Sequence, residues 1–145
     1  MPSLAQSHLC RSADTLSIIV GTHRLTESIL SFRVAPYPLT DDIEIQATPG
    51  HTLSCVTVLV ARSNLSDRAP VAIVGDLFER QQDIDDERLW LDAGSEDPRA
   101  QRTHRARIAN LADWIVPGHG GPFRVDATVR EKLNQQQQQQ AGGTV

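Results

Sequence analysis

Short apolar segments rich in β-branched residues recur along the chain, and glycine, proline, asparagine or aspartate flank them. Segments of this length between turn-forming residues are typical of β-strands rather than of helices. The pattern therefore predicts five strands, at residues 16–20, 43–47, 56–61, 71–74 and 114–116.

One clear helix is predicted between the fourth and fifth of these strands. Asp97 is suited to cap its amino terminus, and Pro98 fits the first helical position. From there to Asp113, helical spacing brings five residues roughly onto one face: Ala100, His104, Ile108, Leu111 and Ala112. The sequence therefore predicts a helix that packs on the sheet through a narrow stripe.

A weaker helical pattern covers residues 127–133 and leads into six consecutive glutamines followed by AGGTV. This polar stretch has almost nothing apolar to bury, so it is predicted to be a disordered tail from Gln135 onward. The length of the chain, 145 residues, suits a single domain with one core.

Composition narrows the range of partners and compartments. Hydrophobic residues make up 39% of the chain but aromatic residues only 4%, so the core is predicted to be aliphatic. A net charge of -4 gives no general attraction for nucleic acid or anionic lipid.

The first residues lack the apolar stretch of a secretory signal, and no apolar run approaches a membrane span, so a cytosolic location is expected, with a nuclear one open. Cys10 and Cys55 form no CxxC and suggest neither a disulfide framework nor a zinc knuckle.

Three motifs share one construction, in which a metal-capable side chain follows the end of a predicted strand. The motifs are TPGHT at residues 48–52, GD at Gly75-Asp76 and PGHGGP at residues 117–122. Imidazole and carboxylate both bind zinc or a similar metal, and neighbouring glycines let loop backbones approach closely around an ion. Each motif alone also suits an ordinary turn. Together they predict a metal site at His51, Asp76 and His119.

TPGHT, AIVGDLFE and ADWIVPGHGGPF resemble, in order and spacing, the third, fourth and fifth metal-binding motifs of the metallo-β-lactamase superfamily. The resemblance runs from about Ser17 to Val125. It implies an α/β (α+β) fold that forms the C-terminal half of an αββα sandwich. The implied organisation is a poorly matched segment at 1–15, a partial metallo-β-lactamase domain at 16–125 and a polar glutamine-rich tail at 126–145.

The resemblance also implies two zinc ions per subunit, held where the two halves meet. His51 matches the histidine that joins the first two histidines of an HxHxDH segment on one ion. His119 matches the histidine that joins the Asp-His pair of that segment on the other ion, and Asp76 matches the carboxylate that bridges both.

No HxHxDH segment occurs before His51, where the nearest histidines are His8 and His23. His23 is predicted to lie in a loop, His8 in a solvated terminus and His104 on a helix face. Without HxHxDH, three ligands remain for two sites, so the chain is expected to be a fragment or short isoform that holds at most one ion weakly and has little activity alone.

Two classes of function remain open from the sequence. The branch of the superfamily that the chain most resembles implies an endoribonuclease that processes histone pre-mRNA, with RNA as substrate. Other branches hydrolyse thioesters, as glyoxalase II does, or β-lactams. The alternative is a non-catalytic isoform that forms a homodimer or pairs with a full-length relative. In either case, an apolar sheet face left uncovered predicts association or aggregation.

Overall fold

The computed structural model of the chain describes residues 16–20, 23–27, 36–65 and 70–141. Two short strands, β1 (Leu16–Val20) and β2 (His23–Glu27), pair with each other in an antiparallel two-stranded sheet. The remaining elements in chain order are β3 (Tyr37–Thr40), β4 (Ile43–Ala47), β5 (Val56–Val60), β6 (Val71–Gly75), η1 (Gln81–Ile84), α2 (Arg88–Ala93), α3 (Pro98–Leu111), β7 (Trp114–Pro117), β8 (Phe123–Arg124) and α4 (Ala127–Ala141).

Six strands form the main sheet in the order β3-β4-β5-β6-β7-β8. All neighbours are antiparallel except β6 and β7, which run parallel and are joined by a crossover that contains α2 and α3. Since β4 and β6 are both antiparallel to β5, the strands β4, β6 and β7 point the same way. Their carboxyl ends therefore meet at one edge of the sheet, where the three predicted metal-site motifs begin.

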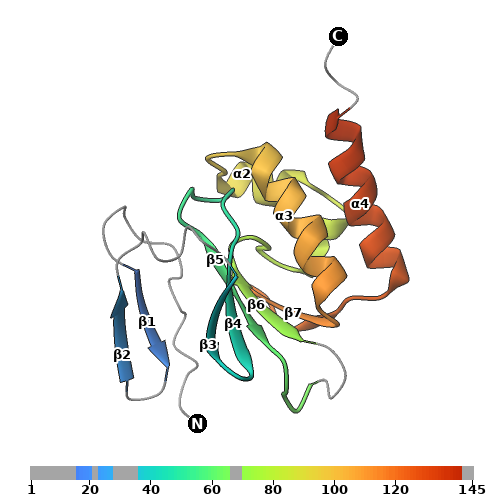
Figure 1. The fold of residues 1–145 in the computed structure, drawn as a ribbon. Helices are drawn as coiled ribbons and strands as arrows, with labels where there is room; N and C mark the ends of the chain where they lie inside the picture. The colour runs from blue at the N-terminus through green and yellow to red at the C-terminus, as the bar shows by residue number, and fades with distance from the viewer. Residues whose placement is uncertain (1–15, 21–22, 28–35, 66–69, 142–145) are drawn as a thin grey trace.

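The helices α3 and α4 lie on one face of this sheet (Figure 1). The core lies between these helices and the sheet. It consists of apolar side chains from the sheet, from α3 and α4 and from the connecting segments: Leu59, Ala72, Val74, Leu77, Phe78, Ile84, Ala106, Ile108, Ala109, Ala112, Ile115, Phe123, Val125 and Leu133. Most of these side chains are aliphatic, as the composition predicts. The mixed α/β class is confirmed.

The five predicted strands are all present, and their ends differ from the prediction by at most one residue. The pattern missed β2, β3 and β8. Consequently His23, predicted to lie in a loop, begins β2. His8 lies outside the described residues.

The predicted helix at Pro98 is also confirmed, and its amino terminus is capped as expected, because the Asp97 carboxylate accepts a hydrogen bond from the Ala100 amide at 2.9 Å. The predicted buried face is wrong in detail. Leu111 is 43% exposed, whereas the polar residues Gln101 and Arg105 are completely buried. Both polar side chains donate hydrogen bonds to buried backbone carbonyls, so their burial does not follow the apolar pattern.

The helix α4 extends through the glutamines to Ala141, which differs from the predicted disordered tail. Leu133 is buried in the core, and Gln136 Nε2 donates to the Ile84 carbonyl at 3.0 Å. Glutamine is itself a good helix former, so a helix anchored at Leu133 continues through it without further apolar contacts.

Cys55 is buried, and it is disulfide-bonded, which the cysteine spacing did not predict. The other cysteine of the sequence, Cys10, lies outside the described residues.

Candidate metal centre

The common direction of β4, β6 and β7 brings the three predicted ligands together. His51 Nε2 lies 3.6 Å from Asp76 Oδ2, and His119 Nε2 lies 3.3 Å from Asp76 Oδ1. The two oxygens of a single carboxylate therefore face two different imidazoles. His51 and His119 are separated from Asp76 by 25 and 43 positions in the sequence, yet both lie beside it, as the strand-end motifs predict.

His51 is oriented by the segment that precedes α3. Its Nδ1 lies 2.8 Å from the Gly94 carbonyl oxygen, which can only accept, so Nδ1 donates the hydrogen bond and Nε2 is the ring nitrogen that faces Asp76. Its backbone carbonyl accepts from the Glu96 amide at 3.1 Å, and the Glu96 carboxylate accepts from the Leu53 amide at 2.7 Å. These contacts present Nε2 to Asp76.

Gln101 on α3 connects the His51 loop with the Asp76 loop. Its Nε2 donates to the Asp76 carbonyl at 3.1 Å and approaches the Leu77 carbonyl at 3.4 Å. Gly50 packs against the backbone of the same residue, so closely that a Cβ on Gly50 would lie 2.5 Å from Gln101 Cα. Only glycine allows this approach, and one residue of α3 thus fixes the positions of two ligand loops.

The His119 loop lies along the backbone that follows Asp76. The Gly118 amide donates to the Phe78 carbonyl at 3.0 Å, and the His119 amide donates to the Glu79 carbonyl at 2.9 Å. A Cβ on Gly118 would overlap Asp76 Oδ1. The glycine before His119 therefore makes room for the carboxylate.

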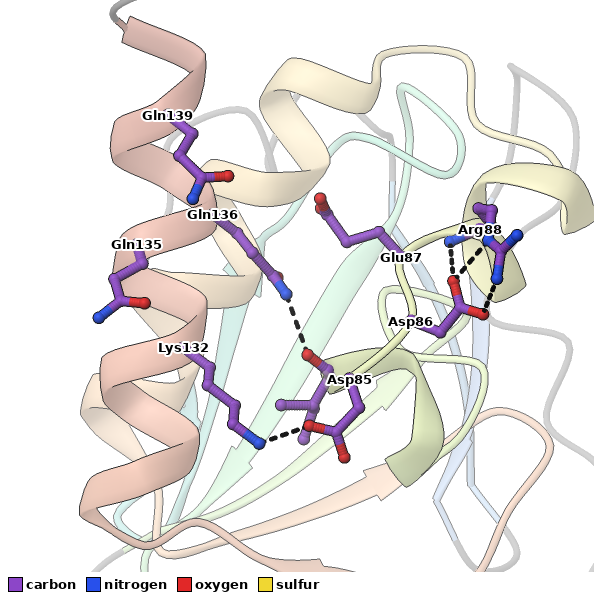
Figure 2. A pocket seen from close by; sticks show the side chains of 9 residues that line it. Asp85, Asp86, Glu87, Arg88, Lys132, Gln135, Gln136 and Gln139 are labelled. Carbon is purple, nitrogen blue, oxygen red and sulfur yellow. Dashed lines mark hydrogen bonds and ion pairs between the residues drawn. The ribbon is translucent and has the colours of Figure 1, made fainter.

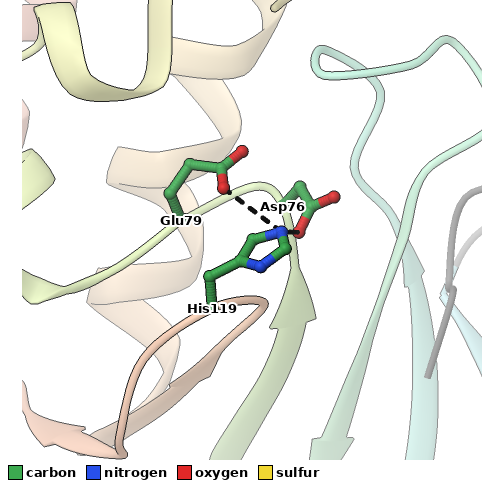
Figure 3. Close-up of side chains that lie close together, drawn as sticks. All are labelled: Asp76, Glu79 and His119. Carbon is green, nitrogen blue, oxygen red and sulfur yellow. Dashed lines mark ion pairs between the residues drawn. The ribbon is translucent and has the colours of Figure 1, made fainter. Parts of the chain in front are cut away.

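Glu79 is a residue of this site that the sequence analysis missed. It is 5% exposed, and its Oε2 lies 3.4 Å from His119 Nε2 (Figure 3). Burial and the neighbouring Asp76 carboxylate raise the pKa of Glu79, and the two histidines partly offset this. Nothing in the sequence pattern marks Glu79 beyond its position three residues after Asp76.

Arg105 and Asp83 hold the segment around Glu79 in place from the core side. Asp83 Oδ2 accepts from the Glu79 amide at 2.7 Å, and Arg105 Nη1 donates to the Leu77 carbonyl at 3.0 Å. Both side chains are completely buried, with Arg105 Nη1 3.6 Å from Asp83 Oδ2. The loop that carries Asp76 and Glu79 is therefore fixed by polar contacts with the core.

The donors present fit a zinc-like cation. Among the described residues, the ligand atoms of Asp76, Glu79 and His119 lie within 4.8 Å of one another. Nitrogen and carboxylate oxygen are common zinc ligands, and the hydrogen bond from Nδ1 of His51 to a carbonyl is the contact that ligating histidines ordinarily make with their second nitrogen.

The chain is similar in sequence to proteins of one superfamily. It is 47% identical over 92 residues to metallo-beta-lactamase domain-containing protein 1 of Xenopus laevis. The matched residues make up 62% of this chain and 36% of that protein. It is 46% identical over 99 residues to the protein of the same name from Rattus norvegicus, covering 68% of this chain and 36% of that protein. These similarities relate the chain to the metallo-β-lactamase superfamily.

A further relative comes from a nematode. A Caenorhabditis elegans protein, named uncharacterized protein C03F11.2, is 34% identical over 88 residues, which cover 60% of this chain and 24% of that protein. No family model matches the chain. The chain spans about a third of the length of the first curated relatives it matches.

A hollow lies away from His51, Asp76 and His119, between α4 and the residues that join η1 to α2 (Figure 2). Its volume is about 430 Å³. The charged groups that line it are paired, Lys132 with Asp85 and Arg88 with Asp86, while Glu87 pairs with Arg102. Because its charges neutralise one another, this hollow offers no set of groups for catalysis.

His104 and the described helices add no further site. His104 lies on α3, as predicted, where it is half-buried and its Nδ1 lies 3.3 Å from Arg107 Nε. Within the described part of the chain, no helix combines the length and apolar character needed to cross a membrane.

Proposed function

We propose that His51, Asp76 and His119 are ligands of a zinc centre in a metal-dependent hydrolase of the metallo-β-lactamase superfamily. The observation that supports this most is the position of the Asp76 carboxylate, whose Oδ1 faces His119 Nε2 at 3.3 Å and whose Oδ2 faces His51 Nε2 at 3.6 Å. A carboxylate that offers one oxygen to each of two imidazoles is arranged as a bridging ligand would be.

The residues of the chain contribute binding and orientation. Gly94 holds the hydrogen of His51 on Nδ1, Gln101 fixes the Asp76 backbone, and Gly118 leaves space for Oδ1. When bound, zinc lowers the pKa of a water ligand and polarises a substrate oxygen. With His119 half-exposed and Asp76 partly exposed, the site is open to a substrate from solvent.

For the reaction, we propose phosphodiester hydrolysis in RNA, with thioester hydrolysis as the alternative within the same chemistry. The resemblance of the motifs to the endoribonuclease branch of the superfamily supports RNA. The net charge of -4 indicates that an RNA substrate is held locally at the metal centre rather than by a basic surface.

The chain on its own is expected to hydrolyse little. Metal-assisted hydrolysis requires a held ion with an open position and a positioned water. The sequence has no HxHxDH segment, which in the superfamily supplies the further ligands and the aspartate that orients the attacking group. A segment of that kind, supplied from outside these 145 residues, is expected to restore activity.

The test is to express residues 1–145, measure zinc uptake by equilibrium dialysis, and assay a single-stranded RNA and a thioester. We expect zinc uptake that Asp76→Asn and His119→Ala weaken, and hydrolysis near background. Uptake that neither variant weakens contradicts the metal centre. Turnover that both variants abolish contradicts the expectation of low activity and shows that residues of this chain complete the site.

A second candidate is a non-catalytic protein that associates with a copy of itself or with a longer relative. One observation favours it: the sheet face opposite the core cluster carries apolar side chains that are only half-buried, namely Ile43, Val58, Val60, Ile73, Trp114 and Val116. Burying such a face against another chain is favourable at about 25 cal/mol per Å² of apolar surface. Analytical ultracentrifugation that shows only monomers across the accessible concentration range would count against this candidate.

A further inference from the structure

The buried carboxylate of Glu79 is not explained by the three-ligand set. Its side chain is only 7% exposed, and its Oε2 lies against His119 Nε2, the same nitrogen that Asp76 Oδ1 approaches (Figure 3). The contact with His119 Nε2 is the one that the structure describes for the Glu79 carboxylate. The hydrogen bonds of Glu79 with Asp83 and with the His119 amide are made by its backbone amide and carbonyl instead.

Two carboxylates around one imidazole nitrogen are arranged as donors around a cation would be. An imidazole nitrogen offers at most one hydrogen, so it cannot donate a good hydrogen bond to both Asp76 and Glu79. Placing a buried carboxylate beside another one costs free energy unless a positive charge lies between them. A metal ion bound to all three groups removes both difficulties.

Two of the three distances between the donor atoms match those of ligands on one zinc ion, and all three atoms lie within 4.8 Å of one another. Zinc bonds of about 2.0–2.2 Å at tetrahedral angles place neighbouring ligand atoms about 3.3–3.6 Å apart. The distances from His119 Nε2 are 3.3 Å to Asp76 Oδ1 and 3.4 Å to Glu79 Oε2. The side chains thus occupy two edges of such a tetrahedron.

We propose that Glu79 is itself a metal ligand, and that Glu79 Oε2, Asp76 Oδ1 and His119 Nε2 form a three-donor site for one divalent cation. This inference rests on the metal centre proposed above and adds a ligand that the motifs did not assign. Three protein donors with a fourth position open are the usual arrangement of a catalytic zinc site. His51 then contributes less to this ion, because it faces the other oxygen of Asp76.

The experiment is a calorimetric titration of the 145-residue chain with Zn²⁺, repeated with Glu79→Gln, His51→Ala and His119→Ala. We expect one equivalent of zinc in the wild type, more than a 100-fold loss of affinity in Glu79→Gln and His119→Ala, and less than a 10-fold loss in His51→Ala. The threshold is set at 100-fold because removing a group that merely orients a ligand typically costs about 10–100-fold.

Glu131→Gln is the matched control, since it makes the same carboxylate-to-amide change at an exposed position on α4 and should bind zinc as the wild type does. Co²⁺ provides a second measurement: its visible absorption bands report its ligands and are expected to change in Glu79→Gln but to persist in Glu131→Gln. Far-ultraviolet circular dichroism and the urea midpoint of Glu79→Gln verify that the variant is folded.

The outcomes separate the two proposals. If Glu79→Gln loses less than 100-fold in zinc affinity, while His119→Ala loses more than that, Glu79 is not a ligand and the proposed metal centre stands. If the wild type binds neither Zn²⁺ nor Co²⁺, the metal centre and the role of Glu79 are both overturned.

Discussion

Replacing Arg105 by methionine is predicted to destabilise the protein more than any single surface change. The guanidinium is completely buried, and its Nη1 and Nη2 donate to the carbonyls of Leu77 and Asp83 at 3.0 and 3.2 Å. Burial lowers the pKa of Arg105 to about 10, which leaves it charged at neutral pH beside the buried Asp83 carboxylate. It also lies over the Phe78 ring at 4.1 Å.

The magnitude follows from what the substitution leaves behind. Removing one partner of a buried ion pair typically costs about 3–5 kcal/mol, because the remaining charge is buried without compensation. Asp83 would retain the backbone amides of Glu79 and Arg80 as donors, which favours the lower end of that range. We therefore expect Arg105→Met to lower the free energy of unfolding by about 3 kcal/mol, a large part of the ~5–15 kcal/mol typical of a domain.

Urea denaturation followed by circular dichroism measures this loss. Arg99→Met, an exposed arginine on the same helix, is the control and is expected to change stability by no more than about 0.5 kcal/mol. Adding Asp83→Asn to Arg105→Met should recover part of the loss, because it removes the uncompensated charge but keeps an acceptor oxygen. A loss under about 1 kcal/mol in Arg105→Met, with no recovery in the double variant, would refute the buried pair as the anchor of the Asp76 loop.

Three further predictions concern α3 and the sheet. Asp97→Ala removes the bond to the Ala100 amide and should cost about 1 kcal/mol, measured as a lower urea midpoint. Burial and a neighbouring arginine lower the pKa of His104, so the unfolded chain binds more protons just below pH 6.5. Stability should therefore rise with pH through that window, and His104→Gln should flatten the rise in urea midpoints measured from pH 5 to 7. Val58→Thr with Ile73→Thr, on the half-buried sheet face, should weaken self-association in light scattering; an unchanged molar mass would argue that another surface associates.

The sequence predicts the convergence of the three candidate ligands better than it predicts their surroundings. His51, Asp76 and His119 could be found because each follows the end of an apolar strand, and parallel strand directions place those ends together. Gln101 and Glu79 could not be found in this way. Their partners Asp76 and His119 lie 25 and 40 positions away, and no local pattern of apolar residues marks a polar side chain that will be buried.

The helices show the same limit. Capping chemistry located the start of α3 correctly, because Asp97 and Pro98 act within one turn of the chain. The prediction of its buried face was wrong, because apolar spacing placed the exposed Leu111 on that face and left out Arg105. Arg105 is buried because it donates to the buried Leu77 carbonyl. The extent of α4 was underestimated because low hydropathy was taken as a sign of disorder, although glutamine continues a helix readily once Leu133 anchors it.

The glutamine run also makes α4 tolerant of changes in its own length. The described contact of this run with the body of the protein is the bond from Gln136 to the Ile84 carbonyl, one residue into the run. Because the six residues from Gln135 are identical, adding or deleting a glutamine leaves the same side chain at position 136, in the same register with Leu133. The helix would simply become longer or shorter at its far end, so repeat-length variants are expected to share one packing and one stability.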